Sequence, residues 1–140
     1  MDKIEALNIV KSIYTEADQI GNMRPIFNNL AEDVIFHSTI PAGTPISGTF
    51  KGKQNVIDFY TNLLPSVAIF QRLTPSAFVM RDDRVIIVGE NIFTLVSTGQ
   101  TYYRPYVYII SMVDRLIAAI TLIQDFSGIS AIYRKTKKHC

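Results

Sequence analysis

Two tyrosines lie on apolar stripes of predicted helices and could take part in chemistry together. Tyr14 follows Val10 on the first stripe, and Tyr60 lies beside Phe59 on a later one. Two phenolic hydroxyls held within about 3 Å of each other could bind a carbonyl or phenol oxygen. Alternatively, both are amphipathic core residues whose hydroxyls satisfy each other.

His37 is one of two histidines in the chain and lies with Ser38 at the end of a predicted strand, beside a loop rich in proline and glycine. Histidine is the usual general base near neutral pH. Because adjacent strand residues point to opposite faces, we do not expect His37 and Ser38 to enter one site together.

Asn91 is a polar residue among apolar neighbours in a later predicted strand, so its buried amide must find partners. A ligand contact and a structural hydrogen bond are both open. We expect Glu90 and Arg104 on the other face of the sheet, where the two charges could pair. Asp125 is expected to point outward and to cap the turn that follows it.

Other catalytic and metal-binding patterns are not found in the sequence. The only cysteine is Cys140, the last residue, so no disulfide framework or zinc-ligand spacing exists. No glycine-rich phosphate loop or nucleophile elbow occurs. We therefore expect no metal and no cofactor.

Composition indicates one folded domain. The chain has 140 residues, of which 48% are hydrophobic and 19% charged, which argues against disorder. Much of its positive charge lies in a tail over residues 131–140, so we expect no nucleic-acid partner. The longest apolar run, residues 116–120, is too short to span a membrane, and no signal-peptide pattern opens the sequence. The expected location is cytoplasmic.

Hydrophobic periodicity predicts three helices followed by a run of strands. The helices are expected over residues 2–20, 25–30 and 56–64, the last ending before Pro65. The strands are expected over residues 34–38, 68–80, 84–97, 101–112 and 116–126, with a loop over 40–48. This order is typical of an α+β domain whose helices cover one face of an antiparallel sheet.

Both faces of the two central strands are apolar, although helices can cover only one of them. A sheet with one wet face should alternate apolar and polar residues. We therefore expect a homodimer through the outer face. The residues assigned to that interface are Ile86, Val88, Ile92, Tyr106, Tyr108 and Ile110.

Many short segments in this order resemble the SnoaL-like, polyketide cyclase-like branch of the nuclear transport factor 2-like superfamily. The segments are Tyr14, Gly21-Asn22, residues 30–34, residues 48–52, Phe59-Tyr60, residues 98–102 and residues 124–128. The resemblance covers about residues 5–130 and implies a single domain over residues 1–130. Its cone-shaped, cystatin-like fold packs three N-terminal helices on one face of a curved, mostly antiparallel sheet. It hosts unrelated activities, so it does not define a reaction.

The resemblance also implies a pocket between the helices and the sheet. Odd-numbered residues of both central strands, and Ala118, Ile120, Leu122 and Gln124 of the last strand, should face it. The ligand-binding residues expected on this basis are Phe36, Ser38, Asn91, Phe93, Val107, Ile109, Leu122 and Gln124.

Three kinds of enzyme with this fold can be compared with the sequence through the same resemblance. Tyr14 and Tyr60 match the tyrosine pair of the steroid isomerases, but Ser38 and Val107 stand where those enzymes carry a carboxylate base and a carboxylic acid. The epoxide hydrolases use a Tyr, an Asn and an Asp-Arg-Asp set, and the cyclases an Asp in the last strand. The corresponding positions here are Phe36, Ser38, Gly89, Asn91 and Leu122, with Leu122 also at the cyclase position. We expect neither steroid isomerase nor epoxide hydrolase activity.

Three functions remain open at this stage. The first is a small soluble domain that binds a small hydrophobic, oxygenated ligand in an apolar pocket. The second is an isomerase, cyclase or lyase for a hydrophobic carbonyl compound, with Tyr14 and Tyr60 stabilising an oxyanion and His37 as base. The third is an interaction domain that works through its outer sheet. A titratable group in the pocket would favour the second.

Overall fold

Helix α1 spans Lys3–Ile20 and has a defined cap at each end. Asp2 Oδ1 accepts a hydrogen bond of 2.8 Å from the backbone N–H of Glu5, which satisfies one of the free amides of the first turn. Gly21 ends the helix in a left-handed conformation with φ +74°, and its N–H donates to the carbonyl of Ala17. The buried stripe, which includes Tyr14, matches the predicted one.

A second long helical stretch runs from Lys53 to Val67 and changes its winding in the middle. It consists of α3 (Lys53–Asp58), a π-helical turn η1 (Phe59–Leu63) and α4 (Leu64–Val67). The predicted end before Pro65 is therefore wrong. Pro65 has no N–H and its ring would clash with the carbonyl four residues earlier in an α-helix. The wider π turn just before it lets the helix pass the proline, with Leu64 N–H donating to Phe59 O.

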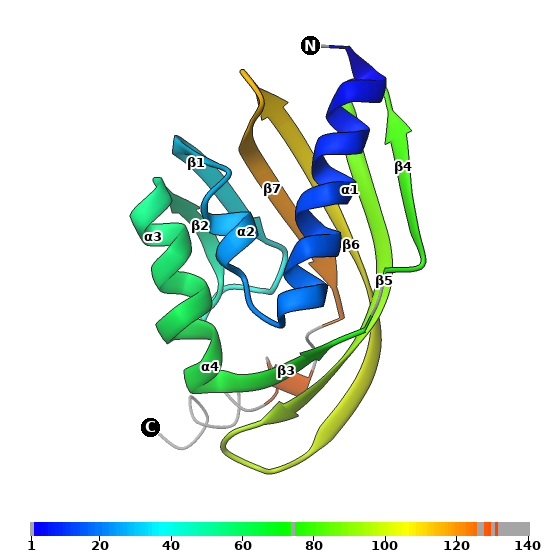
Figure 1. The fold of residues 1–140 in the computed structure, drawn as a ribbon. Helices are drawn as coiled ribbons and strands as arrows, with labels where there is room; N and C mark the ends of the chain where they lie inside the picture. Colours follow the sequence, from blue (N-terminus) through cyan, green and yellow to red (C-terminus); the bar gives the residue numbers. More distant parts are fainter. Residues whose placement is uncertain (1, 74, 126–127, 130, 132–140) are drawn as a thin grey trace.

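The sheet has seven strands and lies against the helices on one side (Figure 1). Its strands are β1 (Leu30–Ser38), β2 (Gly48–Lys51), β3 (Ala68–Arg72), β4 (Ala77–Arg81), β5 (Arg84–Leu95), β6 (Thr101–Val113) and β7 (Leu116–Gln124). The order is β2-β1-β7-β6-β5-β3, and β4 also pairs with β5. All pairs are antiparallel except β1 with β7. The α+β architecture is as predicted.

Several boundaries differ from the sequence-based expectations. The short helix α2 (Arg24–Phe27) ends earlier, because β1 begins at Leu30 rather than at residue 34. The predicted strand over residues 68–80 is two strands that pair with different parts of β5. Strand β2 pairs with β1 from Gly48 onward, so it begins at the last residue of the predicted loop.

The inner face of β5 is formed by its odd-numbered residues, as predicted, but β6 uses its even-numbered ones. Direct cross-strand partners such as Ile87 and Tyr108 share a face, and every such pair joins an odd and an even number. Four residues separate Leu95 from Gln100, whose carbonyl accepts the Leu95 N–H. Because this turn has an even number of residues, each odd-numbered residue of β5 pairs with an even-numbered residue of β6. The assignment of Val107 and Ile109 to the inner face is therefore wrong.

Strand β7 follows the prediction over its second half only. Ile120 and Leu122 are buried, but near the start of the strand Ile117 is the buried residue and Ala118 is only partly covered. The pairing with β6 shifts by one residue between Ser111 and Met112, which is a β-bulge. The bulge explains why simple alternation fails there.

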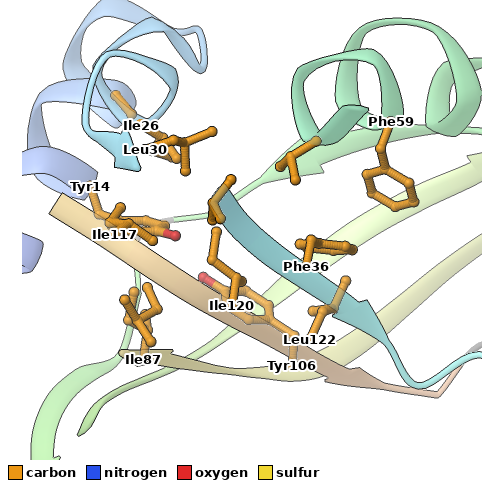
Figure 2. Packing of buried hydrophobic residues seen from close by; sticks show 14 of the residues in the cluster. Tyr14, Ile26, Leu30, Phe36, Phe59, Ile87, Tyr106, Ile117, Ile120 and Leu122 are labelled. Atoms are coloured by element: carbon orange, nitrogen blue, oxygen red, sulfur yellow. The ribbon is translucent and has the colours of Figure 1, made fainter. Parts of the chain in front are cut away.

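The hydrophobic core fills the space between helices and sheet. Figure 2 shows Tyr106 projecting from the sheet among Ile87, Ile120 and Leu122, and both Tyr106 and Ile110 are nearly fully buried. Both had been assigned to the dimer interface, and that assignment is wrong.

The structure describes residues 2–73, 75–125, 128–129 and 131. The predicted basic tail lies outside this range except for Ala131, and so does Cys140. Within the described part, no helix has the length and apolar character needed to cross a membrane.

Candidate functional site

A cavity of about 530 Å³ lies between the C-terminal end of α1, the η1–α4 turn and the inner face of the sheet. Its apolar lining consists of Ala17, Met23, Ile46, Phe59, Leu64, Pro65, Ala68, Ile69, Phe70 and Leu122. Polar side chains also reach it: Asp18, Asn22, Ser38, Tyr60, Asn91, Tyr108 and Gln124. Apolar walls with a few converging polar groups are typical of small-molecule sites.

The π turn explains why consecutive residues of one helix line this cavity. Phe59 and Tyr60 both reach it, and so do Leu64 and Pro65 at the start of α4. Successive side chains of a π-helix are separated by a smaller rotation than in an α-helix, because each turn holds more residues. The sequence predicted a helix here but carried no signal for the change in winding other than Pro65.

A tyrosine pair lies on the wall, although it is not the pair expected. Tyr60 Oη lies 3.5 Å from Tyr108 Oη. The ring of Tyr14 packs against that of Tyr108 with centroids 6.1 Å apart, and Tyr14 is buried outside the cavity lining. Tyr108 had been assigned to the dimer interface because the faces of β6 had been exchanged, and its place on the cavity lining shows that this assignment is wrong. A direct contact between the Tyr14 and Tyr60 hydroxyls stays a prediction.

Two side-chain amides on the cavity lining form hydrogen bonds with each other. Asn91 Nδ2 donates to Gln124 Oε1 at 3.3 Å, and Gln124 Nε2 donates to Asn91 Oδ1 at 2.5 Å. Ser38, which is also buried, lies on the same lining and accepts a weak bond from Ile40 N–H at 3.4 Å. The sequence-based expectation that Ser38, Asn91, Leu122 and Gln124 share one pocket matches this geometry.

Other predicted ligand-binding residues lie elsewhere. Phe36 packs behind the wall against Phe59, with ring centroids 4.6 Å apart. Phe93 lies behind Phe70 in a stacked pair at 5.0 Å. Val107 and Ile109 point to the opposite face of the sheet, because the even-numbered residues of β6 face inward.

His37 is exposed and does not line the cavity, whereas the adjacent Ser38 is buried and does. The two side chains therefore lie on opposite faces, as expected for neighbours in a strand. The His37 ring Nδ1 is 3.0 Å from Thr49 Oγ1 on the neighbouring strand β2. This geometry gives no basis for a role as base in the cavity.

Asp18 is a lining residue that sequence reasoning missed. It lies four residues after Tyr14 on α1, and residues at that spacing share a helix face. That spacing was the signal that could have found it. Asp18 supplies the cavity with a carboxylate, the kind of titratable group on which proton-transfer chemistry depends.

The charges assigned to the outer face are also arranged differently. Arg104 is the cross-strand partner of Asn91 and so lies on the inner side, with its Nε 3.5 Å from Asp125 Oδ2. Glu90 stays on the outer face, where its hydrogen bond with Tyr103 raises the pKa of that phenol. The expected Glu90–Arg104 pair is therefore replaced by these two contacts, whereas the turn that Asp125 is expected to cap includes residues outside the described part of the chain. Among the described residues no metal-binding cluster is found.

Comparison with solved structures assigns the fold. A nuclear transport factor 2-like protein of Burkholderia xenovorans superposes with a TM-score of 0.75 at 22% identity, over 95% of this chain and 98% of that chain. TerC, co-crystallised with polyporic acid, gives 0.71 at 19% identity over 92% and 98%. A Mesorhizobium loti protein provisionally named a SnoaL-like polyketide cyclase gives 0.70 at 13% identity over 88% and 99%.

The chain therefore has the nuclear transport factor 2-like fold, and its structural neighbours include a protein named as SnoaL-like, as the sequence resemblance implied. No protein-family model matches the sequence. No curated protein matches it significantly.

Proposed function

We propose that the protein binds a small hydrophobic ligand carrying oxygen atoms in the cavity beside α1. The observation that supports this proposal is the cavity itself. Its volume of about 530 Å³ falls within the roughly 300–1,000 Å³ common for ligand pockets. Its apolar walls would bind a hydrophobic skeleton, and its hydroxyls and amides would orient the oxygen atoms. The co-crystal of TerC with polyporic acid supports an oxygenated ligand, since that protein shares the fold.

Mass spectrometry of the purified protein tests this proposal, first under native conditions and then after extraction with organic solvent. The wild-type protein is expected to release a small oxygenated compound. Ala17→Leu places a larger side chain at a buried lining position, so the amount of bound compound should fall. Ala42→Leu, at an exposed loop position, is the matched control. Equal ligand content in all three proteins, each shown by circular dichroism to be folded, would count against the cavity as the site.

A second candidate function is proton transfer on a carbonyl compound, and Asp18 is the observation that favours it. Its carboxylate lines the same cavity as the Tyr60–Tyr108 hydroxyl pair. A carboxylate could remove a proton next to a carbonyl, and the two hydroxyls could stabilise the resulting enolate oxygen. An isomerase, cyclase or lyase would use such a step, with Asp18 in the role first considered for His37.

Hydrogen–deuterium exchange in the bound compound distinguishes the two functions. In heavy water, proton NMR should show that the wild-type protein speeds loss of the proton beside the carbonyl. Asp18→Asn should stop that exchange while the compound still binds. Exchange at the background rate with the wild-type protein would leave ligand binding as the function.

A further inference from the structure

The Asn91–Gln124 pair connects strands that are not neighbours in the sheet. Asn91 lies on β5 and Gln124 on β7, with β6 between them. Their partners on β6 are Arg104 and Tyr106, and the residue between these two, Pro105, faces the other side of the sheet. The two amides therefore meet over the backbone of β6, on the face where the cavity lies.

The pair uses half of its hydrogen-bonding capacity. Each primary amide has two N–H donors and an oxygen with two lone pairs, and each bond of the pair consumes one donor and one acceptor. In the part of the chain that the structure describes, neither amide has another side-chain partner. The pair therefore has two free edges, and at each edge the remaining N–H of one amide lies beside the oxygen of the other. The same pattern results if both side-chain amides are flipped.

Such an edge selects a ligand by its hydrogen-bonding pattern. Asn91 is 6% exposed, and a polar group this buried needs partners for its remaining donor and acceptor. A ligand with a donor directly beside an acceptor would satisfy both at once, whereas a ketone or an ether would leave the amide oxygen without a donor. An unsatisfied buried group reduces affinity.

The charges on the lining favour a neutral ligand. Asp18 is acidic, and among the described lining residues there is no lysine, arginine or histidine. A carboxylate ligand would lose its hydration on entering and would meet no opposite charge on these side chains, which is costly.

We propose that the polar end of the ligand is neutral and carries a hydrogen-bond donor directly beside an acceptor, and that it binds the edge formed by Asn91 and Gln124. Lactams, hydroxyketones and enolised diketones have this arrangement. The inference rests on the proposed ligand-binding function and specifies the class of ligand for the same cavity.

Three flat probes of similar size test the proposal by isothermal titration calorimetry. The lactam 2-quinolinone has an N–H beside its carbonyl, N-methyl-2-quinolinone lacks the donor, and 2-naphthoate is an anion. The lactam should bind about threefold to tenfold more tightly than its N-methyl derivative, the range expected for one hydrogen bond. Binding of 2-naphthoate should be the weakest.

Variants test whether the preference for the lactam depends on the amides of Asn91 and Gln124. Asn91→Leu combined with Gln124→Met replaces both partners by apolar groups of similar size, a change that leaves no single amide unpaired. This double variant should bind the two quinolinones equally. Gln71→Met, which removes an exposed amide on β3, should keep the wild-type preference.

The outcomes separate this inference from the proposed function. Equal binding of both quinolinones to the wild-type protein, or tighter binding of 2-naphthoate, would overturn the donor–acceptor proposal. If Ala17→Leu also weakened that binding, the cavity would still be the ligand site. A preference for the lactam that persisted in the double variant would place its recognition elsewhere. Failure of all three probes to bind, together with no extractable ligand, would overturn both proposals.

Discussion

Tyr108 has contacts with several aromatic residues around the cavity. Its hydroxyl lies 3.5 Å from that of Tyr60, and its ring centroid lies 6.1 Å from that of Tyr14 and 5.3 Å from that of Tyr106. Because its side chain also lines the cavity, its hydroxyl can serve both the protein and a ligand. Tyr108 therefore connects the cavity to the core behind it.

Tyr108→Phe should weaken binding of an oxygenated ligand by about threefold to tenfold, the effect of one lost hydrogen bond. Binding of an apolar analogue without oxygen should be unchanged, since the ring remains. Isothermal titration calorimetry measures both affinities. Tyr103→Phe is the matched control, because Tyr103 lies on the same strand but is exposed. Equal losses for the two ligands would contradict a role for the hydroxyl.

Tyr103 offers a separate test of the outer face through its pKa. Its hydrogen bond to Glu90, together with lesser contributions from desolvation and the nearby negative charge, raises the pKa of the phenol above its ordinary value of 10.0. Glu90→Gln should lower the pKa of Tyr103 toward that value, measured by NMR titration of its ring carbons. This contact stabilises the folded protein at pH values below the ordinary phenol pKa, and the stabilisation is lost as the pH rises through the raised pKa of Tyr103. An unchanged pKa in the variant would contradict the assigned contact.

Among the elements, the β5–β6 hairpin shows which features the sequence could predict. Alternation located both strands, and the family resemblance assigned the odd-numbered residues of both to the inner face. That assignment is right for β5, but the inner face of β6 depends on the number of residues in the turn. One polar face and one apolar face on β6 would have identified the inner face, but both faces of this strand are apolar. Ser38, Asn91, Leu122 and Gln124, the cavity residues on β1, β5 and β7, could be predicted because the family resemblance indicates which face of each strand points to the pocket. Tyr108 could not be predicted in this way, whereas Asp18 could have been found from its four-residue spacing to Tyr14 on α1.

The same hairpin contains a close cross-strand contact between Gly89 and Tyr106. The two residues are direct partners in the sheet, and the phenol of Tyr106 lies over Gly89. A methyl group added at Gly89 would lie 2.6 Å from Tyr106 Oη and 2.8 Å from its Cζ. Tyr106 is 3% exposed, so its ring has little room to move.

Gly89→Ala should therefore lower the free energy of unfolding by about 1–3 kcal/mol, as overpacked core substitutions do. Urea denaturation followed by circular dichroism measures the loss. In a Tyr106→Leu background the same glycine substitution should cost less, because the clashing atoms are gone. Additive effects of the two substitutions would contradict this explanation.

At the scale of the whole molecule, the outer face of the sheet is apolar although the helices lie on the other side. Ile86, Val88 and Ile92 are on this face, as predicted, and the register adds Val107 and Ile109 from β6 and Ile123 from β7. Val88 is 37% and Ile123 44% exposed. A continuous apolar surface of this kind is typical of a protein–protein interface.

We propose that a second copy of the chain covers this face. Light scattering coupled to size-exclusion chromatography should give the mass of a dimer at micromolar concentration, because stable interfaces of this type commonly bury about 2,000 Å² or more. Val88→Lys combined with Ile123→Glu should shift the protein to a monomer. Ile4→Lys, at an exposed apolar position on α1, is the control and should leave the mass unchanged. A monomeric wild-type protein would refute the proposal.

The parallel pairing of β1 with β7 has a consequence for how the chain folds. Residues 30–38 lie between β2 and a strand that is synthesised about 80 residues later. The loop between such distant segments must close before their contacts can stabilise it, so these contacts form slowly. While the ribosome is still making the C-terminal strand, the apolar side of β1 and the stripe of α1 have no finished sheet to cover them. A nascent chain that stalls before residue 116 would therefore expose these surfaces, which favours aggregation and binding by chaperones.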